Sequence, residues 1–239
     1  KKLSAKIAAA SQNEDALMAA AGKRNRVMQH ADHKLSELKK IFETDLVGEN
    51  LMFIYSPEGW DPDDAENDEE NRRGIEKIRD IMEEKGYEVA LYDGSASTTK
   101  RKALQTSLKN EEIDALISMK CLDQGIDVPP AKIAIFLAST KNSQQYVQRR
   151  GRILRKYPGK LHAKIFDMLV KPPRTDGDEI TVSDKNLLIR ELKRGGELAY
   201  AAQNKIEALV KIRNIATEYQ LDIHDVPWLD GEKPDKSVI

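Results

Sequence analysis

Five short apolar runs recur along the middle of the chain, separated by segments of helical periodicity. The runs cover residues 51–55, 87–92, 113–119, 133–138 and 163–170. The segments between them that place apolar residues at three- and four-residue steps, as amphipathic helices do, are 68–85, 98–109 and 143–155. Short strands that alternate with helices of this length form βαβ units. The pattern therefore predicts an α/β fold with a doubly wound parallel sheet.

Both ends of the chain have a helical pattern instead. Residues 1–45 are predicted to be a helical connector, and residues 46–172 the α/β domain. Residues 173–239 are predicted to be a helical extension with a polar tail. Within the extension the helix spans about 183–220, and the pair Gly195-Gly196 is expected to interrupt it.

Composition excludes several classes of protein. No run approaches the roughly 18 to 20 apolar residues that a membrane span needs. The single cysteine, Cys121, excludes an internal disulfide and favours a reducing compartment. The histidines have no metal-ligand spacing, so no metal site is expected. These features predict a protein of the cytoplasm or the nucleoid, without membrane contact.

Charge is distributed unevenly, although the net charge is only −1. Residues 58–70 are strongly acidic and are predicted to form a loop. Residues 128–166 contain no Asp or Glu; their basic side chains are Lys132, Lys141, Arg149, Arg150, Arg152, Arg155, Lys156, Lys160 and Lys164. Such a run is typical of a phosphate-binding surface, and a solvated basic face is the alternative.

The candidate chemistry follows the ends of the predicted strands. In an open parallel sheet, ligands bind at the carboxyl ends of the strands. The segments that begin at Ser56, Asp93, Ser118 and Ser139 are therefore the places where functional residues are expected.

The most distinctive segment lies in the last of these, at 148–155, with the sequence QRRGRILR. Gln148, Arg152 and Arg155 are spaced i, i+4 and i+7, so they share one face of the predicted helix. Two guanidiniums beside an amide can clamp a transferring phosphoryl group, because guanidinium donates bidentately and stays charged. An ordinary basic surface helix is the alternative.

This octet resembles motif VI of superfamily 2 helicases, Q-R-x-G-R-x-x-R, at every fixed position. The resemblance implies that Arg152 and Arg155 reach the phosphates of ATP and that Gln148 positions the attacking water. It also implies that Arg149 braces the ATP-binding cleft.

Three further segments resemble motifs of the same family in the same order. Residues 115–129 resemble motif V, which implies that Gly125 and Asp127 contact the ATP ribose and that Ser118 and Lys120 contact nucleic acid. Residues 51–56 resemble motif IV, and residues 93–101 resemble the family's strand–glycine–helix element, with Ser97 or Thr98 as the helix cap. These two matches add nucleic-acid contacts at Ser56, Gly94, Ser95 and Arg101.

Together the motifs imply the C-terminal RecA-like lobe of a superfamily 2 helicase of the DEAD/DEAH type. The sequences of these motifs most resemble those of repair helicases and of the motor subunits of restriction and phage-defence systems. The 239 residues contain no G-x-x-x-x-G-K-[ST] segment, so a first lobe is expected to supply the P-loop and the Mg²⁺ ligands.

The expected function is therefore an ATP-dependent DNA helicase or translocase that hydrolyses ATP only together with that first lobe. The chain lacks an initiator Met, which favours a fragment, and without a P-loop this fragment is expected to be inactive alone. The C-terminal helices are expected to pack on the lobe or on a protein partner. A RecA-like module that binds nucleic acid without hydrolysing ATP is the main alternative, and a small-molecule phosphate enzyme of unrelated fold is a weaker one.

Overall fold

The computed structural model describes six stretches of the chain, which form two compact units. The stretches are 33–56, 67–92, 96–118, 130–137, 143–173 and 179–226, with backbone alone at 67–73, 143–147 and 223. Described residues up to 168 belong to one unit, and those from 169 onward belong to the other. The predictions for residues 1–32, for most of the acidic loop and for the polar tail lie outside these stretches.

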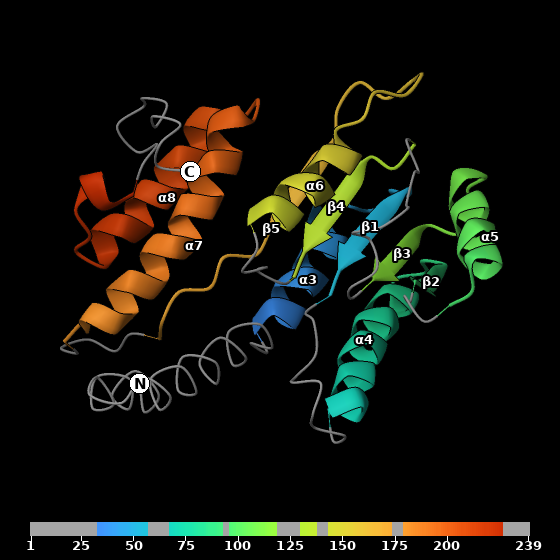
Figure 1. Cartoon of the computed structure of the whole chain (residues 1–239), viewed down its shortest axis with the longest axis horizontal. Coiled ribbons are helices and arrows are strands. Elements are labelled where there is room, and N and C mark those ends of the chain that lie inside the picture. Colours follow the sequence, from blue (N-terminus) through green and yellow to red (C-terminus); the bar gives the residue numbers. More distant parts are fainter. Residues whose placement is uncertain are drawn as a thin grey trace. The chain divides into compact units, whose positions relative to one another are not determined.

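The first unit is built on a five-stranded, fully parallel sheet with the order β2-β3-β1-β4-β5 (Figure 1). Its strands are β1 (Met52–Tyr55), β2 (Val89–Tyr92), β3 (Ala115–Ser118), β4 (Ile133–Phe136) and β5 (Lys164–Asp167). The helices between them are α4 (Asn67–Glu84), α5 (Thr98–Lys109) and α6 (Ser143–Ile153). The predicted α/β fold with a doubly wound parallel sheet is confirmed, and each strand lies within a predicted apolar run.

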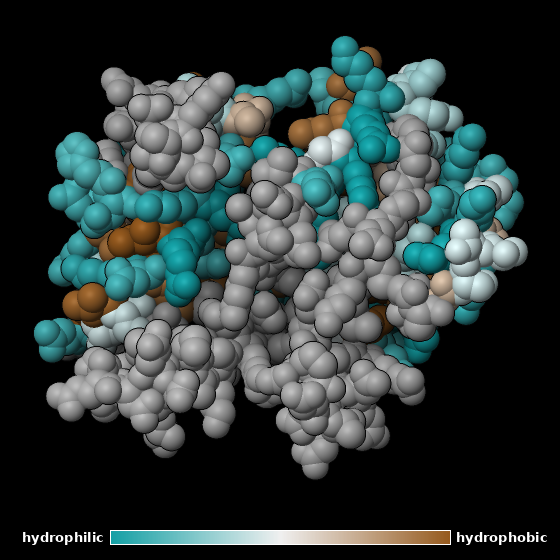
Figure 2. All heavy atoms as spheres, in the orientation of Figure 1, coloured by the Kyte–Doolittle hydropathy of each residue, from teal (hydrophilic) through white to brown (hydrophobic). Residues whose placement is uncertain are grey.

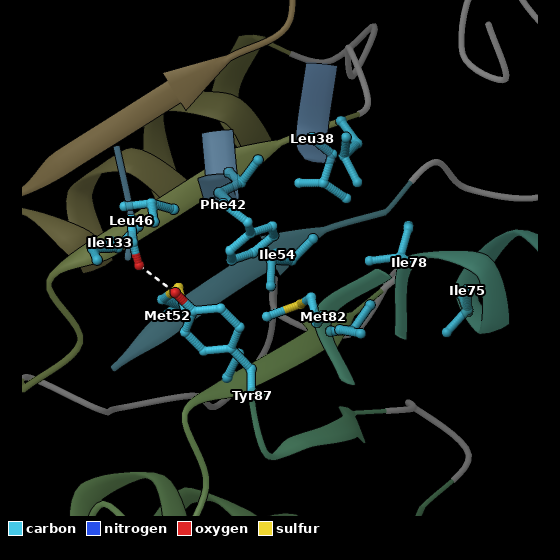
Figure 3. Close-up of a cluster of buried hydrophobic side chains, with 14 residues drawn as sticks. Leu38, Phe42, Leu46, Met52, Ile54, Ile75, Ile78, Met82, Tyr87 and Ile133 are labelled. Atoms are coloured by element: carbon cyan, nitrogen blue, oxygen red, sulfur yellow. Dashed lines mark hydrogen bonds between the residues drawn. The ribbon is translucent and has the colours of Figure 1, made fainter. Parts of the chain in front are cut away.

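One face of the sheet is covered by α3 (His33–Thr44) and α4. Leu38 and Phe42 of α3 pack with Ile78 and Met82 of α4 over alternate residues of the strands, among them Ile54 (Figure 3). At the edge of this cluster the hydroxyl of Tyr87 donates a hydrogen bond to the carbonyl of Leu46, drawn as a dashed line in Figure 3. Helix α3, which precedes the predicted start at residue 46, is part of this core and belongs to the same compact unit.

The opposite face is covered by α5 and α6. Leu108 of α5 and Ile153 of α6 are both fully buried, and they pack in a cluster with Phe53, Tyr55 and Phe136 of the strands. The two clusters take alternate positions of the same strands, as expected for a sheet whose successive side chains point to opposite faces.

An ion-pair cluster joins three strands at their amino ends. Glu49 precedes β1, and its carboxylate accepts a hydrogen bond from Lys164 at the start of β5, at 2.6 Å. The same carboxylate lies 3.3 Å from the ammonium of Lys132, just before β4. The hydrogen bond from Lys164, together with the one from Lys132, holds the pKa of Glu49 below its ordinary value. Paired charges therefore link the amino ends of β1, β4 and β5.

The second unit is a pair of helices, α7 (Val182–Ala201) and α8 (Lys205–Glu218), followed by the short turn η2 (Ile223–Asp225). The expected interruption at Gly195-Gly196 is wrong, because α7 runs through both glycines. A Cβ on Gly195 would come within 2.6 Å of Leu169 Cδ1, so close packing explains the glycine. A buried ion pair also fixes this unit: Glu191 binds Arg194 at 3.1 Å and accepts from the amide of Val170.

On the face shown in Figure 2, the described residues of the second unit are mostly hydrophilic, with hydrophobic side chains exposed between them. Among the exposed apolar residues are Val182, Ile206 and Val210. None of the described helices is long and apolar enough to cross a membrane.

Candidate functional site

Two of the predicted nucleic-acid residues meet at the carboxyl ends of the central strands. The amide of Ser56 donates to the carbonyl of Ser118 at 2.9 Å, and both side chains are buried. The hydroxyl of Ser118 has no hydrogen-bond partner among the described residues. A buried hydroxyl with no partner among the described residues can donate to an incoming phosphate or carbonyl oxygen.

The start of α5 is capped as the sequence predicts. Ser97 is the N-cap, and its hydroxyl accepts a hydrogen bond from the amide of Lys100 at 3.2 Å. Arg101, one turn into the helix, is half-buried, and its guanidinium lies 3.5 Å from the hydroxyl of Thr98. The cap therefore satisfies one of the amides that a phosphate could otherwise bind, and the others remain at the helix end.

Helix α6 is held against the sheet through its inward face, where Arg149 and Ile153 lie one turn apart. Arg149 is only 1% exposed, and its guanidinium carbon lies 5.3 Å from the centre of the Tyr55 ring. That ring stacks in turn on Phe136, with centroids 4.7 Å apart. Arg149 is thus packed over two strands through a cation–π contact, which is strongest where water is excluded.

The other predicted site residues of the octet differ in their exposure. Gln148 and Gly151 are exposed, and Arg152 is half-buried. The helix ends at Ile153, so exposed Arg155 lies just beyond it, with its amide 3.3 Å from the carbonyl of Arg152. Because Arg149 and Ile153 anchor the helix, Gln148 and Arg155 are left exposed, whereas one guanidinium nitrogen of Arg152 is buried.

The arginine end of α6 lies beside the amino end of β4, because Lys160 reaches both. Its ammonium lies 2.5 Å from the carbonyl of Ala131, just before β4, and 2.5 Å from that of Ile153. The expectation that all candidate residues gather at the carboxyl ends of the strands is therefore wrong for Arg152 and Arg155. A crossover helix runs antiparallel to its strands. The octet at the C-terminus of this helix therefore lies at the amino ends of the strands and not at their carboxyl ends.

The basic run 128–166 does not form one surface. Lys132 and Lys164 pair with Glu49 at the amino edge, and Arg149 is buried over Tyr55. Lys160 binds carbonyl oxygens, and burial lowers the pKa of its ammonium. The interpretation of this run as a single phosphate-binding surface is corrected accordingly, because neighbours in the sequence lie on different strands and faces.

Five predicted site residues, Gly94, Ser95, Lys120, Gly125 and Asp127, lie outside the described residues. Within the described stretches, no group of three His, Cys, Asp or Glu side chains could hold a metal ion. Two residues that the geometry brings to α6 were not singled out from the sequence. Tyr55 looks like any buried strand residue, and Lys160 like one more basic residue, although the turn residues Pro158-Gly159 before it indicate that the chain folds back.

One known family matches part of this α/β lobe. Residues 67–157, from α4 to the loop after α6, match the family described as "Helicase conserved C-terminal domain". The part of the chain from α4 to the loop after α6 is therefore similar to a helicase C-terminal domain, as the motifs predict.

The relatives that match are themselves named as helicases. The "DNA 3'-5' helicase XPB" of Mycobacterium tuberculosis is 33% identical over 94 residues, which is 38% of this chain. A protein of Sulfolobus islandicus filamentous virus, named "Putative helicase 22", is 29% identical over 93 residues, or 39% of this chain. The chain spans 17% of the length of each of these two relatives.

Among solved structures, the C-terminal domain of the DEAD-box protein Dbp5 is similar, with a TM-score of 0.46 and 17% identity. The match covers 69% of this chain and 79% of that one. The Pyrococcus furiosus Hef helicase domain has a TM-score of 0.41 and 19% identity, over 74% of this chain and 35% of that one.

Proposed function

We propose that this chain is the second motor lobe of an ATP-dependent DNA helicase or translocase. The observation that carries the proposal is the orientation of α6 within a helicase C-terminal domain. Arg149 and Ile153 hold one face of the helix in the core, whereas Gln148 and Arg155 are exposed on the outside. Such a helix can offer its outer residues to a nucleotide that is bound by another lobe.

On the nucleotide side, Arg152 and Arg155 act as arginine fingers, and Gln148 orients the attacking water. Guanidiniums stabilise the charge of the transferring phosphoryl group, and in related systems one such finger changes the rate by roughly 10³- to 10⁵-fold. The P-loop and the Mg²⁺ ligands come from another lobe, because these 239 residues contain no P-loop sequence. Gly125 and Asp127 complete the nucleotide contacts at the ribose.

On the nucleic-acid side, the contacts lie at the carboxyl edge of the sheet. Ser56 and Ser118 are joined there, and the hydroxyl of Ser118 has no partner among the described residues. Arg101, Lys120, Gly94 and Ser95 complete this set. Contacts with the phosphate backbone position nucleic acid without selecting sequence, so the motor moves along a strand whatever its sequence. The name of the mycobacterial relative favours DNA as that strand.

Ser56 and Ser118 lie at the carboxyl ends of the strands and the arginine end of α6 lies beside the amino end of β4, and this separation suits a motor. An eleven-residue helix is about 16 Å long, and its arginine end is beside the amino end of β4. Closure on ATP engages the arginine end, and hydrolysis removes those contacts, so the cleft opens again. Movement of this lobe as a rigid body then changes the contacts with nucleic acid at the carboxyl ends of the strands.

The test is ATP turnover by the full-length polypeptide, which includes a P-loop lobe, with and without DNA or RNA. In Arg155→Ala, DNA-stimulated turnover is expected to fall by roughly 10³-fold or more while ATP still binds, because the finger acts in the transition state. The control is Arg79→Ala, which removes a half-buried arginine that lies 3.7 Å from Glu83 on α4. It is expected to keep native turnover.

Each outcome has a defined meaning. Turnover that is independent of Arg155 removes the arginine-finger role and the motor with it. Nucleic-acid binding without any turnover in the native polypeptide supports the alternative of a non-hydrolysing binding module. Stimulation by RNA and not by DNA overturns only the proposal that the nucleic acid is DNA.

A further inference from the structure

The chain folds back on itself directly after the arginines. Tyr157-Pro158-Gly159-Lys160 has proline at the second position and glycine at the third, the sequence signature of a type II turn. The amide of Lys160 donates to the carbonyl of Tyr157 at 3.0 Å, and Gly159 has a φ of +81°, as the third position of that turn requires. The turn brings the side chain of Lys160 back to the end of α6.

There the ammonium of Lys160 meets three backbone carbonyls from two segments of the chain. It lies 2.5 Å from the oxygen of Ala131 and 2.5 Å from that of Ile153. It also lies 3.1 Å from the oxygen of Arg155. The last carbonyls of a helix lack partners within the helix, and a lysine can satisfy them. Ile153 is the last residue of α6, whereas Ala131 precedes β4.

We propose that Lys160 is a positioning residue that fixes the arginine end of α6 against the amino end of β4. Its role rests on the proposed function, because it acts through Arg152 and Arg155 and touches neither nucleotide nor nucleic acid. The hydrogen bond to the carbonyl of Arg155 is the strongest argument for this role. Arg155 lies beyond the helix; its amide donates to the carbonyl of Arg152 at 3.3 Å, and Lys160 adds the hydrogen bond that holds the carbonyl of Arg155.

Such a contact affects catalysis more than nucleotide binding. Arginine fingers engage only when the cleft is closed, and their benefit depends on their exact placement at that moment. A misplacement of about 1 Å can cost a reaction roughly 100-fold. Loss of the Lys160 contact is therefore expected to lower kcat and to leave the KM for ATP nearly unchanged.

The experiment compares Lys160→Met, Arg155→Ala and the double variant in the full-length polypeptide. Methionine keeps the length and apolar stem of lysine but removes its three donors. Lys160→Met is expected to lower kcat by about 10- to 100-fold. In the Arg155→Ala background, the same substitution is expected to lower kcat by much less, because residues that act through one another are not additive.

Amide hydrogen exchange gives a second measurement that does not depend on activity. Lys160→Met is expected to increase exchange at Leu154 and Arg155, whose amides donate to the last turn of α6, and to leave α4 protected. The control is Lys85→Met. It removes a lysine that binds Glu43 at 2.8 Å in the same unit, so it reproduces the loss of a paired ammonium away from α6. Native kcat is expected there.

The possible results separate the two proposals. If kcat falls equally in both backgrounds, or falls as much in Lys85→Met, Lys160 only stabilises the fold and the positioning role is overturned. If exchange rises at Leu154 and Arg155 but Arg155→Ala has native turnover, the contact is confirmed and the proposed function fails. Native kcat and native exchange in Lys160→Met reject the contact itself.

Discussion

Replacement of Gly151 by alanine is expected to raise stability and lower turnover at the same time. Gly151 is exposed and lies within α6, and a Cβ at this position would meet nothing within 4 Å in the described structure. In a helix, glycine is less favourable than alanine, so the unoccupied space around it needs an explanation outside this lobe. The proposed motor supplies one, because the nucleotide or the first lobe approaches this face when the cleft closes.

The magnitudes follow from helix propensity and from packing. Glycine to alanine in a helix gains about 0.5 to 1 kcal/mol, and Gly151 lies near the C-terminus, so the lower value applies. For a chain of this length, that gain raises Tm by about 1 to 2 °C. A methyl group forced into a close-packed contact costs roughly 1 to 3 kcal/mol. If that cost arises only in the closed state, kcat falls by about 5- to 150-fold.

Two assays measure the two effects separately. Thermal unfolding of the 239-residue chain gives the stability, and DNA-stimulated ATP turnover of the full-length polypeptide gives kcat. Gly74→Ala in α4 is the matched control, because a Cβ there also meets nothing within 4 Å and α4 is outside the proposed site. It is expected to gain similar stability with native turnover. Native turnover in Gly151→Ala would refute the reasoning, and so would a fall in its stability.

Two further predictions concern the scaffold. Glu49→Gln is expected to lower the free energy of unfolding by about 1 kcal/mol at pH 7, because it breaks the pairs with Lys164 and Lys132. The pKa of Glu49 is lowered in the folded chain, so its contribution is present above its ordinary pKa and is lost as pH falls through the lower value. Urea unfolding should therefore show the difference shrinking below about pH 4, and a difference that persists at acid pH would contradict this cause. Gly195→Ala is expected to destabilise by up to about 2 kcal/mol, since the contact with Leu169 costs more than the helix gains. In a Leu169→Ala background the same substitution should become stabilising, and an unchanged sign would show that Leu169 is not the cause.

The three central strands could be predicted because they are buried on both faces, whereas the edge strands β2 and β5 are mostly only partly buried. A strand covered by helices on both sides needs an unbroken apolar run, and a run such as Ile133–Phe136 is visible without further information. The cap at Ser97 could also be predicted, because a hydroxyl at that position serves the helix end locally. Local chemistry therefore predicted the elements and their order.

Contacts between distant segments could not be predicted in this way. The close approach of Leu169 explains why α7 continues through Gly195, and nothing near Gly195 in the sequence indicates it. Arg149 is a similar case. Its position one turn before Ile153 places it on the inward face, but only the Tyr55 ring makes burial of a guanidinium favourable. The placement of Arg155 at the amino edge depends likewise on the length of α6 relative to β4.

Helix α3 has a consequence for any attempt to produce this lobe separately. Leu38 and Phe42 are almost fully buried, and Lys34 donates to the carbonyl of Leu137 at the far end of β4. Removal of two such side chains from a core costs roughly 3 to 6 kcal/mol, which is comparable with the entire stability of many domains. A protein expressed from the first strand onward would thus expose the apolar face of the sheet that α3 covers, and it would be prone to aggregation. The smallest autonomous folding unit begins at or before His33, ahead of the segment that matches the helicase family.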